Sequence, residues 1–130
     1  MPRTKIVFYC EENGTVPVLD WLRGLPPKAQ DKCVVRIERL AELGHELRRP
    51  EADLLRDKIY ELRVGLQGQN YRILYFFHGT TAAVLAHGLI KERAVSPADI
   101  ERAIERRRRF EADPETHTYV GEGGSHGKNN

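Results

Sequence analysis

Three segments joined by short turns constrain the fold of this chain most. They span residues 58–64, 70–77 and 82–91, and in the first two the side chains alternate between the two faces of a strand. Turn residues separate the segments, first at 65–69 and then at His78–Thr80. Connections this short join antiparallel neighbours, because a parallel crossover needs about a dozen residues or more. The sequence therefore predicts an antiparallel meander of three strands.

Signals of a further strand and of helices flank this meander. A short strand of β-branched and aromatic residues is expected over Ile6–Cys10. Two amphipathic helices follow, over residues 17–24 and 26–44, and together they form a helical hairpin. Downstream, Ser96 and Asp99 flank a proline and mark the start of a final helix. We therefore expect the order βααβββα, an α+β domain in which the helical hairpin and the C-terminal helix pack on one sheet.

The length and composition of the chain fit one globular domain. With 130 residues, of which 40% are hydrophobic and 31% charged, it can bury an ordinary core without disulfides. We expect the domain over residues 1–111 and interpret the polar, glycine-rich residues 112–130 as a flexible tail. Cys10 and Cys33 lack metal-ligand spacing and are interpreted as reduced core residues. Because no apolar run suits a membrane span or a signal peptide, a cytoplasmic protein is expected.

The charge distribution and the missing motifs narrow the possible functions. The net charge is only +2, yet residues 54–110 carry 11 basic and 6 acidic side chains. Such a basic half favours an anionic partner. The sequence has no Walker loop, dinucleotide fingerprint, paired-histidine zinc motif or serine nucleophile elbow. We therefore expect neither a cofactor nor a metal.

Basic side chains of the predicted strands share one face. If the helices cover the face of Tyr71, strand parity places four residues together on the opposite face. These residues are Arg63, Arg72, His87 and Lys91. Such a cluster can hold a phosphate and stabilise the charge that develops when a ribose 2′-hydroxyl attacks it. In the alternative interpretation, these cations only form ion pairs with Glu61, Glu92 and acids of the helices.

Several segments, in this order along the chain, are similar to one family of proteins. The segments are Val18–Leu22, Ile59–Val64, Asn70–Phe77 and Leu85–Lys91, followed by a helix start at Pro97. They resemble the RelE/ParE superfamily of toxins, and the match is to the phage-derived HigB-like branch of type II toxin–antitoxin systems. The resemblance covers about residues 5–110 and implies a RelE-like fold.

The resemblance also implies an activity and partners. A toxin of this kind is a metal-independent, ribosome-dependent endoribonuclease, an mRNA interferase. It cuts mRNA in the ribosomal A site and so inhibits translation. The expected partners are therefore mRNA, the ribosome and a cognate antitoxin, often a helix-turn-helix protein encoded alongside. No membrane partner is expected.

The matching motifs imply the site residues. Arg72 in Tyr-Arg-Ile and Lys91 at the end of the last strand match the family's contacts to the scissile phosphate. Arg63 matches the arginine of Glu-Leu-Arg, a phosphate or rRNA contact, and Arg93 lies where relatives carry a basic or polar residue. Further contacts to rRNA are expected from Arg106, Arg107 and Arg109. In the alternative interpretation, these arginines form a solvated helix end stabilised by the helix dipole.

The proton donor and the proton acceptor are the open points of this assignment. The final helix carries Phe110, which has no proton to give, whereas relatives have a tyrosine or histidine in this region. His87, His117 and Tyr119 are the candidates. Two alternatives therefore stay open: a non-enzymatic, ParE-like inhibitor of DNA gyrase, and a nontoxic phage-derived protein that binds nucleic acid or a partner.

Overall fold

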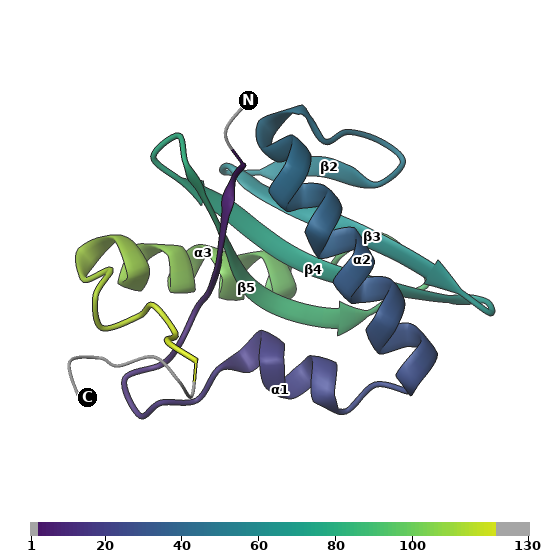
Figure 1. Cartoon of the computed structure of the whole chain (residues 1–130), viewed down its shortest axis with the longest axis horizontal. Helices are drawn as coiled ribbons and strands as arrows, with labels where there is room; N and C mark the ends of the chain where they lie inside the picture. The colour runs from purple at the N-terminus through teal and green to yellow at the C-terminus, as the bar shows by residue number, and fades with distance from the viewer. Residues whose placement is uncertain (1–2, 122–130) are drawn as a thin grey trace.

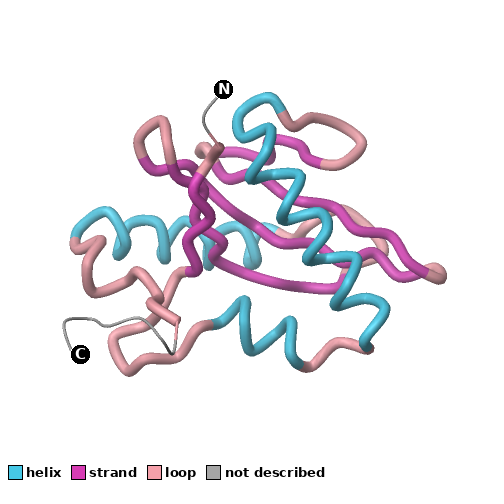
Figure 2. Tube along the Cα trace, in the orientation of Figure 1, coloured by secondary structure: helices cyan, strands magenta, loops and turns pink. Residues whose placement is uncertain are grey.

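A five-stranded mixed sheet forms the centre of the protein. The computed structural model describes residues 3–121, and the strand order in the sheet is β1-β5-β4-β3-β2 (Figure 1, Figure 2). The strands are β1 (Lys5–Phe8), β2 (Ala52–Arg56), β3 (Ile59–Leu66), β4 (Gln69–His78) and β5 (Ala82–Ile90). β1 pairs with β5 in parallel, whereas the other neighbouring strands are antiparallel.

The predicted meander is confirmed as β3, β4 and β5. β3 and β4 pair as far as Leu66 opposite Gln69, so the connection between them is only Gln67-Gly68. Both residues of this connection have positive φ angles, 52° and 81°. A tight type I′ hairpin turn requires this conformation at both of its central residues. The predicted turn over 65–69 is therefore too long, since its outer residues belong to the strands.

Two features of the sheet correct the prediction. The expected order βααβββα lacks β2, an edge strand of five residues. In β2, Leu54 is exposed beside the charged Asp53 and Arg56, so no alternating apolar face marks this strand in the sequence. The first strand spans Lys5–Phe8 rather than Ile6–Cys10, and it is parallel to β5. The predicted α+β class, with helices on one sheet, is confirmed.

Helices cover both faces of the sheet. The helices are α1 (Pro17–Arg23), α2 (Pro27–Leu43) and α3 (Pro97–Ala112), and the 3₁₀ turn η1 (Gly44–Glu46) follows α2. In Figure 1, α2 passes in front of β3 and β4, whereas α3 lies behind the sheet. All three predicted helices are therefore confirmed. However, only α1 and α2 cover the face of Tyr71, and α3 covers part of the face expected to be open.

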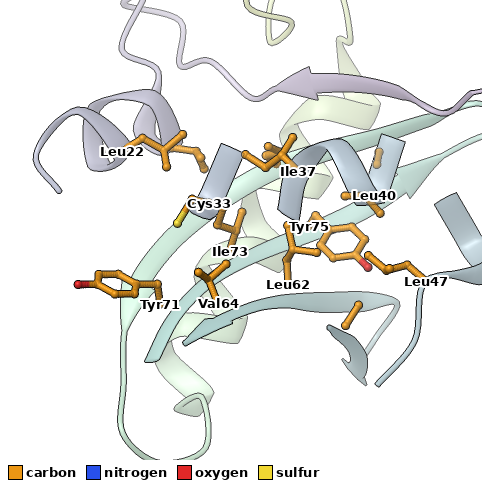
Figure 3. Close-up of a cluster of buried hydrophobic side chains, with 14 of the residues drawn as sticks. Leu22, Cys33, Ile37, Leu40, Leu47, Leu62, Val64, Tyr71, Ile73 and Tyr75 are labelled. Atoms are coloured by element: carbon orange, nitrogen blue, oxygen red, sulfur yellow. The ribbon is translucent and has the colours of Figure 1, made fainter. Parts of the chain in front are cut away.

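Each face of the sheet carries its own hydrophobic core. The first core lies under α1 and α2 and contains Cys33 and Ile37 from α2 and Ile73 from β4 (Figure 3). The second core lies under α3 and joins Phe76 of β4 to Phe110, with ring centroids 5.8 Å apart. Successive residues of β4 thus enter different cores, because side chains alternate across a strand. This explains why β4 is apolar on both faces.

α1 lies in close contact with β5. The indole ring of Trp21 packs directly on Gly88, where a Cβ atom would lie 2.3 Å from Trp21 Cδ2. The same ring contacts Tyr71 of β4 edge-on, with centroids 6.4 Å apart. Glycine at position 88 therefore permits the short distance between this helix and the sheet.

The residues after α3 return to the edge of β1. Tyr9 and Thr118 form an isolated antiparallel bridge. The backbone N–H of Cys10 donates to the carbonyl of His117 at 2.9 Å, and the buried His117 ring stacks on Tyr9. The tail predicted over 112–130 begins with this segment, and its part beyond residue 121 lies outside the described residues.

Two further findings concern the cysteines and the helices. Cys10 and Cys33 are buried free thiols, as predicted. Burial raises the pKa of the Cys33 thiol to about 11. In residues 3–121, no helix has both the length and the apolar character that crossing a membrane requires.

Candidate functional site

Strand register brings the predicted basic residues together on the α3 side of the sheet. Two rows of side chains run across β3, β4 and β5 there. The first row is Glu61, Leu74 and His87, and the second row is Arg63, Arg72 and Leu89. Residues that follow each other diagonally in such rows are about 7–8 Å apart. Arg72 and His87 are therefore diagonal neighbours on one face, as strand parity predicted.

A buried carboxylate lies at the centre of these rows. Glu61 is only 2% exposed. Its Oε2 accepts a hydrogen bond from Arg63 Nε at 2.9 Å, and its Oε1 accepts one from Arg72 Nη1 at 2.8 Å. Arg63 and Arg72 are direct partners on neighbouring strands, and two like charges in this arrangement repel each other. Glu61 compensates this repulsion by binding both guanidinium groups.

The two arginines differ in their other contacts. Arg63 also donates from Nη2 to Asp53 Oδ2 at 3.2 Å, and Asp53 in turn pairs with Arg49 at 3.0 Å. The Arg72 side chain is only 14% exposed, and its Nε has no hydrogen-bond partner. It is the only buried side-chain nitrogen or oxygen in residues 3–121 of which this is true. Arg72 thus shares its one carboxylate with Arg63, and part of the hydrogen-bonding capacity of its guanidinium group stays unused.

A second polar group lies where β5 ends and α3 begins. His87 Nε2 and Asp99 Oδ1 are 2.9 Å apart, and Ser96 Oγ donates to Asp99 Oδ2 at 2.7 Å. Lys91 Nζ lies 3.9 Å from Asp99 Oδ2. Asp99 therefore connects the start of α3 to two of the predicted site residues, His87 and Lys91.

Burial and hydrogen bonds together set the pKa values of His87 and Asp99. Burial lowers the pKa of His87 below its ordinary value, although the hydrogen bond to Asp99 acts in the opposite direction. Burial also opposes ionisation of Asp99, but hydrogen bonds from Ser96 and His87 outweigh it and hold the pKa of that carboxyl below its usual range. Near pH 7, His87 is therefore neutral beside an ionised Asp99.

The arginines of α3 lie on two sides of the helix. Arg106 Nε lies 3.5 Å from Glu11 Oε2, on the side of Arg109, whereas Arg107 lies on another side. Arg106 is half-buried, donates to the carbonyl of Ala86 at 2.7 Å and lies 5.8 Å from the ring centroid of Tyr9. Arg107 donates to the carbonyl of Asp57 at 3.1 Å, on the side of the β2–β3 turn. Arg109 is exposed and bonds to Glu11 at 3.3 Å. The rRNA contacts predicted for Arg106, Arg107 and Arg109 stay a prediction, and the three side chains do not form one surface.

The remaining candidates lie apart from the two groups. Arg93 is exposed in the loop between β5 and α3. His117 is buried against β1, and its Nδ1–H donates to the carbonyl oxygen of Cys10 at 2.7 Å. Tyr119 lies on the same edge, where its backbone N–H donates to Phe8 O. β1 is separated from β3 by β5 and β4, so His87 is the proton-transfer candidate that shares a face with Arg63 and Arg72.

Three acidic residues of the site carry little signal in the sequence. Glu61 is expected only as an ion-pair partner, and Asp99 only as a sign of a helix start. Asp53 carries no signal, because no strand is predicted over residues 52–56. For Glu61 a signal exists, since it has the same strand parity as Arg63 and Arg72. In the described part of the chain, no three His, Cys, Asp or Glu side chains are arranged to hold a metal ion.

Comparison with known families agrees with this description. The family model of the phage-derived Gp49-like proteins (DUF891) matches residues 20–108, which include most of the helical hairpin, the whole meander and most of α3. The chain belongs to this phage-derived Gp49-like family. A comparison with curated proteins gave no match. The family membership agrees with the phage-derived branch that the sequence motifs indicated.

Proposed function

We propose that this protein is the toxin of a type II toxin–antitoxin system and acts as a metal-independent, ribosome-dependent mRNA endoribonuclease. One observation supports this most. Arg63 and Arg72 stand opposite each other on neighbouring strands and share a single buried carboxylate, while Arg72 Nε has no partner. A surface that only binds protein does not need two cations that converge in this way. Membership of the Gp49-like family and the resemblance to HigB-like toxins favour the same function.

The chemistry requires one attack and one departure at a phosphate. The ribose 2′-oxygen bonds to phosphorus, the bond from phosphorus to the 5′-oxygen breaks, and a 2′,3′-cyclic phosphate results. The phosphate gains negative charge on the way, which Arg72 and Arg63 stabilise. Neutral His87 accepts the proton of the 2′-hydroxyl. Lys91, on the other side of Asp99, carries a proton for the departing 5′-oxygen.

The proposal can be tested by primer extension on a reporter mRNA after brief induction of the protein. We expect new cuts within codons of the reading frame, and we expect them to disappear when translation is blocked. The double variant Arg72→Ala/Lys91→Ala should abolish the cuts. The matched control is Arg23→Ala/Lys28→Ala, which removes the same charge from exposed residues of the α1–α2 region and should leave the cuts unchanged.

Other outcomes would identify the alternatives. Growth arrest with intact mRNA would refute the nuclease and favour a protein target, such as DNA gyrase for a ParE-like inhibitor. If the induced cells show no growth arrest and no cuts, a nontoxic protein that binds nucleic acid or a partner would be favoured. Cuts that persist in the Arg72→Ala/Lys91→Ala variant would show that these two residues do not carry the reaction.

A further inference from the structure

The contact between His87 and Asp99 restricts which nitrogen of the imidazole carries the proton. An ionised carboxylate only accepts hydrogen bonds. Since Asp99 Oδ1 lies 2.9 Å from His87 Nε2, the neutral ring must carry its hydrogen on Nε2 to make this bond. Nδ1 then has a free electron pair and is the nitrogen able to accept a proton.

Nδ1 of His87 is in contact with solvent. It has no hydrogen-bond partner among residues 3–121. Arg72 Nε is the only side-chain nitrogen or oxygen of the described residues that is both buried and without a partner. His87 Nδ1, which has no partner, is therefore not fully buried. The His87 side chain is 16% exposed, so its basic nitrogen keeps contact with solvent on the sheet face that carries Arg72.

Asp99 also makes hydrogen bonds within the first turn of α3. Ser96 Oγ donates to Asp99 Oδ2. Ser96 Oγ also accepts a hydrogen bond from the backbone N–H of Asp99 at 3.2 Å. The cap of a helix and the orientation of the His87 ring thus depend on one carboxylate. In the Ser-His-Asp triad a carboxylate likewise orients the imidazole and fixes its tautomer.

We infer that Asp99 is a positioning residue, which holds His87 as the Nε2-protonated tautomer and makes Nδ1 the acceptor of the 2′-hydroxyl proton. This inference rests on the proposed nuclease function and assigns, within it, the accepting nitrogen of His87 and the residue that positions the ring. The proton leaves the ribose 2′-oxygen, whose electron pair forms the new bond to phosphorus, and His87 becomes an imidazolium ion. Asp99 stabilises that cation through the hydrogen bond it already makes.

The charges around His87 set how its protonation responds to pH. From α3 the ring faces Asp99, Arg102 and Arg106, and from the sheet and its end it faces Arg72 and Lys91. Burial and the arginines favour the neutral ring, and Asp99 favours the charged ring. The cleavage rate should therefore rise with pH through a pKa below 6.5 and then level off, because only the neutral ring accepts a proton.

The first experiment measures the tautomer without any need for activity. Long-range ¹H–¹⁵N spectra of the full-length protein at pH 7.5 report which ring nitrogen carries hydrogen, and a His87→Gln spectrum assigns the signals. We expect the Nε2-protonated form for the wild type and its loss in Asp99→Asn. Ser96→Ala is the matched control, because it removes the other hydrogen bond of Asp99 and weakens the α3 cap. It should lower stability and leave the tautomer unchanged.

The second experiment measures single-turnover cleavage of ribosome-bound mRNA as a function of pH. Asp99→Asn should lower the plateau rate by about 10²-fold, as expected when general-base catalysis is impaired. It should also shift the inflection to lower pH and leave ribosome affinity unchanged, whereas Ser96→Ala should keep the wild-type inflection.

The outcomes separate the inference from the proposed function. An Nδ1-protonated His87, or an Asp99→Asn variant with the wild-type rate and pH profile, would overturn the role of Asp99 and leave the nuclease standing. If the wild-type protein does not cleave mRNA at all, the proposed function itself is refuted. The role of His87 as proton acceptor is then refuted with it, whatever its tautomer.

Discussion

Glu61 should be the most sensitive polar residue of this fold. It is nearly inaccessible to solvent and binds two guanidinium groups that face each other across β3 and β4. The change Glu61→Gln keeps the size of the side chain and removes its charge. The amide oxygen can still accept from one arginine, but the amide nitrogen is a donor and must face the other.

The magnitude follows from the two arginines taken separately. Arg63 is about a third exposed and keeps its second carboxylate, Asp53, at 3.2 Å, so it loses little. Arg72 is largely buried and has no other carboxylate within 4 Å among the described residues. Removing one partner of a buried ion pair costs about 3–5 kcal/mol. Because Arg72 keeps slight contact with water, we expect a loss near the lower limit, about 3 kcal/mol in the free energy of unfolding.

Urea denaturation followed by circular dichroism measures this loss. The midpoint of the transition should fall while its slope stays the same. An unchanged slope shows that the variant has lost stability without a change in the surface exposed on unfolding. The matched control is Glu51→Gln, which also removes one carboxylate bound by two arginines, but one with 24% of its side chain exposed. Its loss should be smaller, because solvent screens these ion pairs more than those of Glu61.

A double variant separates the buried charge from other effects. In Glu61→Gln/Arg72→Met the unpaired guanidinium is gone and an apolar side chain of similar length replaces it, so most of the lost stability should return. The reasoning is refuted if Glu61→Gln destabilises the protein no more than Glu51→Gln. It is also refuted if the double variant is less stable than Glu61→Gln alone.

Three further predictions concern other parts of the molecule. Gly88→Ala should destabilise the fold by about 1–3 kcal/mol, because its Cβ would lie 2.3 Å from the Trp21 ring, and Gly88→Ala/Trp21→Leu should recover part of this in thermal melts. The folded-state pKa of His87 is lower than the 6.5 of the unfolded chain, so its contribution to stability is complete above pH 6.5 and is lost as pH falls through the folded-state pKa. Stability curves of His87→Gln should be flatter over that window, and equal pH slopes would contradict the assignment. Cys33, with a buried thiol of pKa about 11, should react with a disulfide reagent at pH 8 only after unfolding, and fast labelling of the native protein would contradict its burial.

Local pattern is sufficient for most of the elements in this fold. The meander, the helical hairpin and the capped start of α3 are all read from alternation, prolines and glycines along the chain, because these signals depend on backbone conformation at neighbouring residues. β2 cannot be predicted in this way. It is an edge strand with Leu54 exposed, and residues 52–56 form a strand because they pair with β3, not because of their own sequence pattern.

The parallel pairing of β1 with β5 is a second feature that local pattern does not contain. The two strands are far apart in sequence, and the residues of β1 specify a strand but not its neighbour. The side of the sheet on which α3 packs is equally non-local. Phe110 packs against Phe76 in the core on one face of the sheet, whereas Tyr71 lies in the core on the other face. Only the packed structure shows which face α3 can cover.

Strand alternation alone predicts which side chains share a face of the site. Arg63, Arg72 and His87 lie together because successive side chains of a strand point to opposite faces, a property of the backbone that needs no tertiary information. What these side chains bind depends instead on contacts between distant segments. Strand register places Glu61 between the two arginines, and the docking of α3 brings Asp99 to His87. Register and docking follow from the burial of both faces of the sheet at once, and no short segment of the chain contains that information.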